Sequence, residues 1–513
     1  MKIVTGKKMQ ELDRRAIASG VSGDVLMARA GQGAYEETLA FAERLPARHR
    51  RRIVIVNGKG NNGGDGYVVA RLLHQHTGYH VEVYATCPVA DLQGDARLHA
   101  DRMPAAVPFA VCEQLPDRAL CPGTIVVDCL LGTGIRGDVR EPYATIIQQI
   151  NDAMLPVVAM DIPSGVDADT GAVGNVAVRA DCTVTMALPK VGLLSGFGAR
   201  YCGTLRCIDI GIPAECVTGL DSAGEATFAD DVRRFVPRLP AHTHKGDMGR
   251  IMIIGGSDRF PGAPMLAAAG ALRAGGGLVS VAYPSSIGPL LSVTDNAVIR
   301  VPVPDDGTGT HQPFDAASQA DLLAAQNVVV VGPGLTRSPA ALGLVRDIVA
   351  TDLPLILDAD ALGVCGEAIE QLQARALTVL TPHPGEMRQL IARCSLDRLA
   401  DADRIGQALG VAESLHAIVV LKGHRTVIAS PDGQVFINSS GTPALAGGGS
   451  GDVLSGVIGA LLCRTESPLD AVRLAVFVHG LAAELSTVGM RGLIADDQPA
   501  LIARALRELS PLA

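Results

Sequence analysis

The sequence contains no tryptophan, and aromatic residues make up only 3% of its 513 residues. It has no stretch of about 18 consecutive apolar residues, which is the length that a membrane-spanning helix needs. It also has no long run of lysine and arginine, and its net charge is −9. A chain without a basic patch lacks the electrostatic footprint of a nucleic-acid or acidic-membrane binder, so we expect neither partner.

The eleven cysteines include no CxxC pair, and their odd number argues against a framework of disulfides. Most of them lie in apolar segments, as Cys129 and Cys182 do, where reduced cysteine behaves as a small buried hydrophobic residue. The first ten residues lack the apolar stretch of a signal peptide. These features predict a cytoplasmic protein.

What the sequence does contain is alternation between apolar, β-rich runs and helical stretches. Hydrophobic residues make up 48% of the chain, and its length exceeds what one core usually serves. Runs without strict polar alternation predict α/β architecture, with helices on both faces of largely parallel sheets. A polar, proline-containing segment at 214–245 separates two such series. We therefore predict two α/β domains of three layers each, at 1–220 and 225–510.

In the second domain, a glycine-rich string at 446–456 places four glycines and a serine before Asp452 and the start of an apolar helix. Clustered backbone N–H groups and a helix N-terminus bind phosphate. A carboxylate at that place could deprotonate a hydroxyl for phosphoryl transfer. The same string is compatible with an ordinary glycine turn in which Asp452 caps the helix. The local string alone leaves both interpretations open.

In the first domain, three polar loops follow predicted strands at 56–66, 127–138 and 161–167. Because the carboxyl ends of parallel strands meet at one edge of a sheet, we expect Asn62, Asp128, Asp161 and Ser164 to converge. Their carboxylate, amide and hydroxyl oxygens suit a hard cation. The loops contain no Walker A motif, which needs a lysine and then a serine or threonine after its second glycine.

The strings NGKGNNGGDG, VDCLLGTGIRG and MDIPSGVD in these loops resemble those of the NAD(P)H-hydrate epimerase domain, over about residues 1–215. The resemblance implies a Rossmann-like fold and a potassium ion held by Asn62, Asp128 and Ser164. It also implies that Asp161 is the acid and base at C6 of the nicotinamide ring. Lys190 is either its catalytic partner or a surface lysine. The implied substrate contacts are Asn61, Asn62, Gly63, Gly64, Asp65, Gly132, Thr133, Gly134, Ile135, Arg136, Gly137, Asp138, Tyr143 and Asp161.

The strings GGSDRFPGAP, GPGL, TPHPGE and GGSGDVLSG in the second half resemble the ADP- or ATP-dependent NAD(P)H-hydrate dehydratase family, over about 230–510. That family is a branch of the ribokinase-like fold. The resemblance implies that Asp452 is the catalytic base, and Asp358 and Asp360 are candidate Mg²⁺ ligands or a simple strand-end turn. The implied hydrate contacts are Ala263, Gly334, His383 and Asp452. The implied nucleotide contacts are Lys422, Gly423, His424, Arg425, Thr426 and Gly451.

Together the two resemblances imply a bifunctional isomerase and lyase that repairs nicotinamide nucleotides. It would epimerise the R and S forms of NADHX or NADPHX, and it would dehydrate the S form with ADP, giving AMP and phosphate. ADP is preferred over ATP because the chain resembles the ADP-using members, and the choice between NADHX and NADPHX stays open. A small-molecule alcohol kinase and a nucleotide-binding module are the alternatives, and TPHPGE counts against the kinase. We expect a homo-oligomer, as is usual for such folds.

Overall fold

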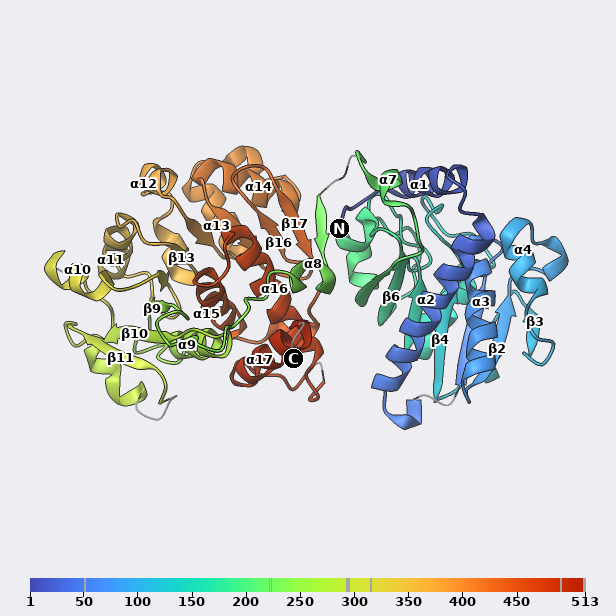
Figure 1. The fold of residues 1–513 in the computed structure, drawn as a ribbon, viewed down its shortest axis with the longest axis horizontal. Coiled ribbons are helices and arrows are strands. Elements are labelled where there is room, and N and C mark those ends of the chain that lie inside the picture. Colours follow the sequence, from blue (N-terminus) through green and yellow to red (C-terminus); the bar gives the residue numbers. More distant parts are fainter. Residues whose placement is uncertain are drawn as a thin grey trace. The chain divides into compact units, whose positions relative to one another are not determined.

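The computed structural model describes residues 1–49, 52–220, 222, 224–291, 296–313, 316–489 and 491–510. The chain divides into two compact units, Met1–Ala226 and Thr227–Ala513, each built on its own sheet (Figure 1). Within the described ranges, no helix is both long and apolar enough to cross a membrane.

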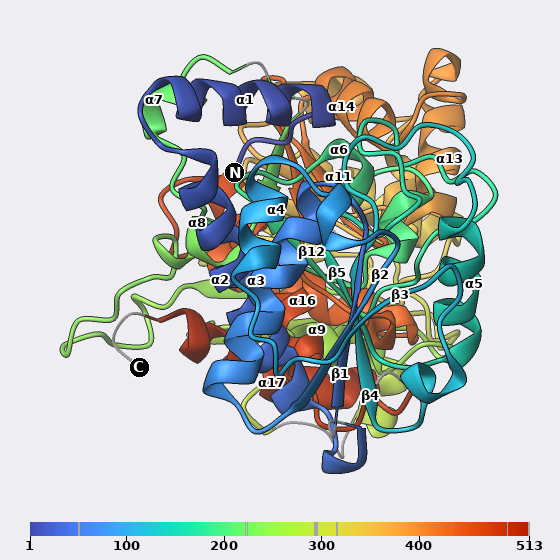
Figure 2. The same cartoon turned by 90° about the vertical axis from the view of Figure 1, so that its right-hand side faces the viewer.

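The first unit has a seven-stranded sheet whose paired neighbours all run parallel. In sheet order its strands are β3 (Phe109–Val111), β2 (His80–Ala85), β1 (Arg52–Asn57), β4 (Thr124–Cys129), β5 (Val157–Met160), β6 (Cys182–Met186) and β7 (Thr204–Ile208). Its helices are α1 (Gly6–Ala18), α2 (Gly23–Arg44), α3 (Asn61–His76), α4 (Gly94–Asp101), α5 (Tyr143–Ala153), α6 (Val191–Leu194) and α7 (Ala214–Val217). Figures 1 and 2 show α1 lying across one end of these strands.

Buried residues cover both faces of this sheet. Along β1, Ile53 and Ile55 belong to a cluster with α2 and α3, whereas Val54 and Val56 belong to a cluster with α5. Side chains of a strand point alternately to opposite faces, so a run of consecutive apolar residues needs helices on both sides. The predicted α/β three-layer class is confirmed.

The second unit is built on a ten-stranded sheet. In sheet order its strands are β11 (Ile299–Val303), β10 (Leu278–Pro284), β9 (Arg250–Ile254), β12 (Val328–Val331), β13 (Leu355–Leu357), β14 (Thr378–Leu380), β15 (Ile418–Leu421), β16 (Val427–Ala429), β17 (Val435–Asn438) and β8 (Glu225–Thr227). Its helices are α8 (Ala229–Arg233), α9 (Ala263–Arg273), α10 (Ala316–Leu323), α11 (Pro339–Val349), α12 (Ile369–Ala374), α13 (Pro384–Arg393), α14 (Arg404–Leu415), α15 (Ser450–Leu462), α16 (Pro468–Glu484) and α17 (Gln498–Leu509). The pairs from β11 to β15 are parallel, and β15–β16–β17 is antiparallel.

Helix α15, which carries Asp452, packs against α9 over one face of this sheet. The two helices approach so closely that a Cβ atom on Gly456 would lie 1.8 Å from the carbonyl oxygen of Ala267. Glycine is therefore required at 456 for α15 to take this position. The contact fixes the start of α15, and with it the glycine-rich loop, relative to the sheet.

Candidate active sites

The predicted cation ligands of the first unit lie together at the carboxyl ends of the strands. The Ser164 hydroxyl donates to Asp128 Oδ1 at 2.6 Å, and the Ser164 N–H donates to Asp128 Oδ2 at 2.9 Å. Asn62 Nδ2 donates to the carbonyl of Leu131 at 2.8 Å, and the Leu131 N–H donates to Ser164 Oγ at 2.8 Å. Leu131 thus links Asn62 to Ser164, and Ser164 is bonded directly to Asp128.

Two atoms of this group lack a partner that a cation would supply. Asn62 Oδ1 is buried and has no hydrogen bond in the described part of the chain. Asp128 is fully buried, and its burial raises the pKa to about 6 although Ser164 and Leu130 donate hydrogen bonds that lower it. An orphaned amide oxygen beside a buried carboxylate and a hydroxyl is a donor set that fits a hard cation such as K⁺.

Asp161, which is partly exposed, forms an ion pair with the buried Lys190 at the same edge of the sheet. Lys190 Nζ donates to Asp161 Oδ1 at 2.5 Å, and to Thr185 Oγ1 and the carbonyl of Met186 at 3.0 Å each. The Lys190 side chain has no exposed surface, so the surface-lysine interpretation is wrong. Asp161 has a φ of 60°, a conformation that non-glycine residues seldom adopt and that clusters at functional sites.

The predicted substrate contacts 61–65 form the first turn of α3. Gly63 has to be glycine, because a Cβ atom there would lie 2.0 Å from the Gly58 carbonyl oxygen. In the 132–138 loop, Arg136 donates to Asp169 at 2.6 Å and lies 3.4 Å from Asp167. Its guanidinium is therefore engaged by carboxylates in this conformation. The Tyr143 hydroxyl, at the start of α5, accepts a hydrogen bond from Thr86 at 3.3 Å.

In the second unit, Asp452 lies in the first turn of α15 and does not cap it. The N-cap is Gly449, whose φ is 88°. The alternative in which Asp452 is a plain N-cap is therefore wrong. Burial, followed by repulsion from Asp358 and Glu386, raises the pKa of Asp452 to about 7, and Lys422 opposes this rise. A carboxyl group that titrates near neutral pH is suited to proton transfer.

Lys422 lies within this group of carboxylates. Its Nζ donates to Asp358 Oδ1 at 2.7 Å and lies 3.9 Å from Glu386 Oε2. Burial lowers the pKa of Lys422, but Asp358 and Glu386 outweigh it, and the pKa is raised. The ammonium is also the nearest neighbour of the place where a Cβ on Gly451 would stand, at 3.2 Å. Lys422 and Gly451, both predicted nucleotide contacts, are therefore adjacent.

His383 is the N-cap of α13, and its ring orientation is fixed by the backbone. Nδ1 accepts hydrogen bonds from the N–H groups of Gly385 and Glu386, at 2.9 and 3.2 Å. The neutral ring therefore carries its proton on Nε2. The Glu386 carboxylate in turn accepts the His383 N–H at 2.7 Å, completing a capping box. Glu386 was not predicted from the sequence, although its place three residues after the capping residue His383 is typical of a capping box.

The two candidate magnesium ligands face different partners. Asp358 is 1% exposed and accepts hydrogen bonds from Lys422, from Thr381 Oγ1 at 2.7 Å and from the Ala359 N–H at 2.9 Å. Asp360 accepts from Arg337 Nε at 2.7 Å. In the described residues, no three histidine, cysteine, aspartate or glutamate side chains are grouped as a metal site.

The remaining predicted contacts surround this group. Ala263 starts α9, and its Cβ would lie 3.1 Å from a Cβ on Gly334, whose φ is 68°. The start of α9 also lies close to the glycine-rich loop. A Cβ atom added to Gly449 would be 2.6 Å from Leu266 Cδ1. In the segment 422–426, Arg425 is buried and Thr426 Oγ1 donates to the Gly423 carbonyl at 3.0 Å; the backbone carbonyl of His424 accepts from Arg404.

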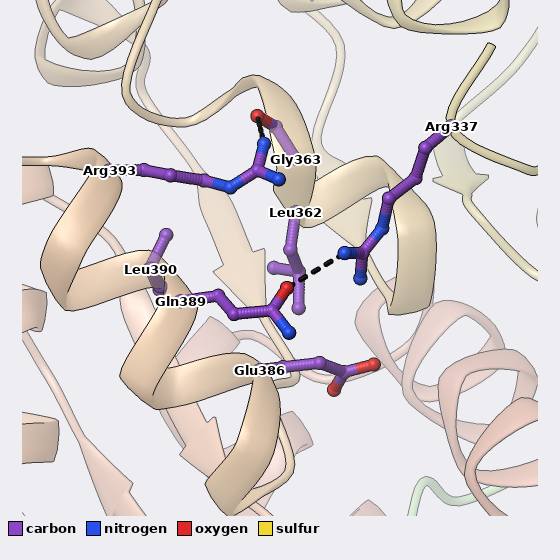
Figure 3. A pocket seen from close by; sticks show the side chains of 7 residues that line it. All are labelled: Arg337, Leu362, Gly363, Glu386, Gln389, Leu390 and Arg393. Atoms are coloured by element: carbon purple, nitrogen blue, oxygen red, sulfur yellow. Dashed lines mark hydrogen bonds between the residues drawn. The ribbon is translucent and has the colours of Figure 1, made fainter.

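A small cavity of about 10 Å³ lies beside this site (Figure 3). It holds about one water-sized group. Its lining residues are Arg337, Leu362, Gly363, Glu386, Gln389, Leu390 and Arg393. Arg337 donates to Gln389 Oε1 at 2.7 Å, and Arg393 donates to the Gly363 carbonyl at 2.8 Å. Glu386 lines the cavity and also lies near Lys422. Neither Asp452 nor His383 lines the cavity.

These features define a two-domain α/β protein with a carboxylate–lysine pair in each domain, one beside a donor set that fits a cation and one beside a glycine-rich loop. Residues 251–499 match the family model described as NAD(P)H-hydrate dehydratase, and residues 23–192 match that of the YjeF-related protein N-terminus. The bifunctional NAD(P)H-hydrate repair enzyme of Moorella thermoacetica is 37% identical over 520 residues, which cover 99% of this chain and 97% of that protein. The chain belongs to the family of bifunctional NAD(P)H-hydrate repair enzymes.

Another member and one solved structure are also similar. The repair enzyme of Escherichia coli is 35% identical over 478 residues, covering 92% of this chain and 87% of that protein. The ADP/ATP-dependent NAD(P)H-hydrate dehydratase of Bacillus subtilis, co-crystallised with ATP and Mg²⁺, is 30% identical. It covers 56% of this chain and 99% of its own, with a TM-score of 0.47.

Proposed function

We propose that this chain repairs hydrated nicotinamide nucleotides, with the epimerase in the first unit and the dehydratase in the second. The observation that carries the proposal is that each family motif places a carboxylate beside a buried lysine. Asp161 pairs with Lys190 in the first unit, and Asp452 stands beside Lys422 in the second. Full-length similarity to bifunctional repair enzymes supports the same assignment.

In the second unit, Asp452 takes the proton of the C6 hydroxyl of the S hydrate. The oxygen then attacks the terminal phosphoryl group of the nucleotide, and the N–H groups of the glycine-rich loop stabilise the charge that develops there. The C6–O bond breaks with loss of phosphate, the ring nitrogen lone pair drives its departure, and the dihydropyridine is restored. With ADP as donor, the products are the reduced nicotinamide nucleotide, AMP and phosphate. A pKa of about 7 makes Asp452 a base near neutral pH.

The nucleotide and its ion fit the site in different ways. Lys422 and Gly451 are adjacent to each other and to Asp452, so they suit contacts to the phosphates. Asp358 and Asp360 do not fit a direct Mg²⁺ site, because they are engaged by Lys422 and Arg337. We propose instead that Mg²⁺ is held by the phosphates and water, as is common for this ion, where it neutralises phosphate charge.

In the first unit, Asp161 acts as the acid and base at C6, and Lys190 is its catalytic partner, which donates a hydrogen bond to its carboxylate. Asn62, Asp128 and Ser164 would hold K⁺, which when bound supplies positive charge beside the substrate. ADP as the donor, a cytoplasmic location and a homo-oligomer stay predictions. Light scattering during gel filtration measures the oligomeric state.

The first experiment follows the ultraviolet absorbance of purified protein given an epimeric mixture of NADH hydrate, Mg²⁺, K⁺ and either ADP or ATP. Return of the whole reduced-nicotinamide absorbance with one nucleotide supports both activities and identifies the donor. Return of about one epimer's share, followed by a slow spontaneous phase, contradicts the epimerase assignment. No return, with nucleotide still bound and a phosphorylated alcohol formed instead, favours the kinase alternative. The same assay with NADPH hydrate identifies the preferred substrate.

A further inference from the structure

One carboxylate of the first site has no role in the chemistry above. Asp65 is the fifth residue of α3 and is only 8% exposed. Within the described part of the chain, its side chain takes part in no hydrogen bond or ion pair. An ionised carboxylate that is buried without a partner is costly, so a group in this position favours its neutral form.

A second carboxylate comes from α1, which lies outside the residues 23–192 matched by the family model. The chain before α1 runs beside Lys190: the Val4 N–H donates to the Pro189 carbonyl at 3.0 Å, and the Val191 N–H donates to the Val4 carbonyl at 2.9 Å. Met9 and Leu12 of α1 pack in one cluster with Leu188. These contacts hold α1 across the strand ends (Figures 1 and 2).

Asp13, the residue after Leu12, consequently faces the ion pair. Burial, with Asp161 as a like charge, raises its pKa to about 6, while Lys190 lowers it. The groups that face Asp65 are Asp161 after β5, Asp13 on α1, Lys190 before α6, and the neutral Cys129 thiol on β4. Burial, then repulsion by Asp161 and Asp13, raises the pKa of Asp65 well above its usual range.

The charges in this cluster do not balance. Asp13, Asp65 and Asp161 are three carboxylates, and Lys190 is one ammonium. Asp161 Oδ1 accepts hydrogen bonds from the Lys190 ammonium, the Thr185 hydroxyl and the Met186 N–H, whereas Asp65 has no such donors among the described residues. Carboxylates that share a site cannot all ionise in a buried environment, so a proton remains with the other two.

We propose that Asp65 is the proton donor of the first site and that Asp13 is a positioning residue that keeps this donor protonated. The proposal rests on the epimerase function proposed above. The carboxyl group of Asp65 protonates the C6 hydroxyl, the C6–O bond breaks, and water leaves as the ring nitrogen lone pair fills the vacancy. Water adds to the opposite face of the resulting cation and loses a proton to Asp161. That proton returns to Asp65, so atoms and charge balance over the cycle.

The test compares Asp65→Asn, Asp13→Asn and the control Glu11→Gln. Glu11 is on the same helix and forms a half-exposed ion pair with Arg15. Epimerase kcat/KM is measured from pH 5 to 10, with dehydration of the S hydrate as internal control. We expect Asp65→Asn to lose about 100-fold or more. Asp13→Asn should keep activity at low pH while its alkaline limb moves down by about one pH unit, because a like charge is removed. Glu11→Gln should superimpose on the unaltered protein.

Infrared difference spectra give a readout that does not depend on turnover. The C=O stretch of a protonated carboxyl should be present at pH 8.5 in the full chain, where Asp452 is largely ionised, and should lose intensity in Asp65→Asn. An unchanged spectrum, near-normal epimerase activity of Asp65→Asn, or an unmoved alkaline limb in Asp13→Asn overturns the proposal. If the unaltered protein carries the band but does not interconvert the hydrates, the epimerase function fails and the buried proton at Asp65 stands.

Discussion

Replacing Asp452, the proposed catalytic base, by asparagine should stabilise the second unit while abolishing dehydration. The pKa of Asp452 is raised from 3.8 to about 7, so the folded state holds a proton that the unfolded state releases. Stability is therefore lost as pH rises from about 4 to 7. A rise of three units corresponds to about 4 kcal/mol, and we take about half of it because Asp452 is partly exposed. Asp452→Asn avoids this cost and should be more stable by about 2 kcal/mol at pH 8.

The assay is urea or thermal unfolding of Asp452→Asn and the unaltered protein at pH 4.5, 6 and 8. The transition of the second unit is identified as the one that nucleotide shifts. The midpoint difference should be small at pH 4.5 and reach roughly 5 °C at pH 8. Asp401→Asn, which changes an exposed aspartate of the same unit, should show no such difference. A difference that does not grow with pH would refute the reasoning, because it would mean that Asp452 ionises normally in the folded state.

Three further perturbations test the first unit. Asp161→Asn should abolish interconversion of the hydrates and leave dehydration of the S form intact, so a hydrate mixture should recover only its S share of absorbance; near-normal turnover of the R form would contradict the assignment. Lys190→Met should lower the unfolding free energy of the first unit by about 3–5 kcal/mol, because it leaves Asp161 without its buried partner. A melting temperature within about 1 °C of that of the unaltered protein would argue against this pairing. Exchange of K⁺ for a large organic cation should slow epimerisation but not dehydration. The Ser164→Ala variant should show a weaker dependence of the epimerisation rate on K⁺ concentration. Equal epimerisation rates with and without K⁺ would rule out the cation site.

Much of this architecture follows from local patterns. The apolar runs at 52–57 and 124–129 predict strands at the positions of β1 and β4, because strands buried on both faces are uniformly apolar. The convergence of Asn62, Asp128 and Ser164 followed from the rule that strand ends meet at one edge. The antiparallel strand β17 was missed, although Asp432–Gly433 before it is a hairpin signal.

The electrostatic state of the sites could not be predicted in the same way. Lys190 is five residues from Thr185 and 29 from Asp161, and only the path of the chain buries it against both. Lys422 and Asp358 are 64 residues apart in the sequence. A motif identifies which side chain is placed for chemistry, but its pKa depends on charges contributed by several elements.

Both proposed sites use the same balance of charge. In each unit three carboxylates surround one buried lysine: Asp13, Asp65 and Asp161 around Lys190, and Asp358, Glu386 and Asp452 around Lys422. In each, one carboxylate, Asp161 or Asp358, accepts a hydrogen bond from the lysine ammonium. Because one ammonium cannot neutralise three neighbouring carboxylates, repulsion among them helps to raise the pKa of another. Asp452 and Asp65 are the carboxyl groups whose pKa is raised in this way, that of Asp452 to about 7. The excess of negative charge in each site thus raises the pKa of the carboxyl group that is proposed to transfer a proton.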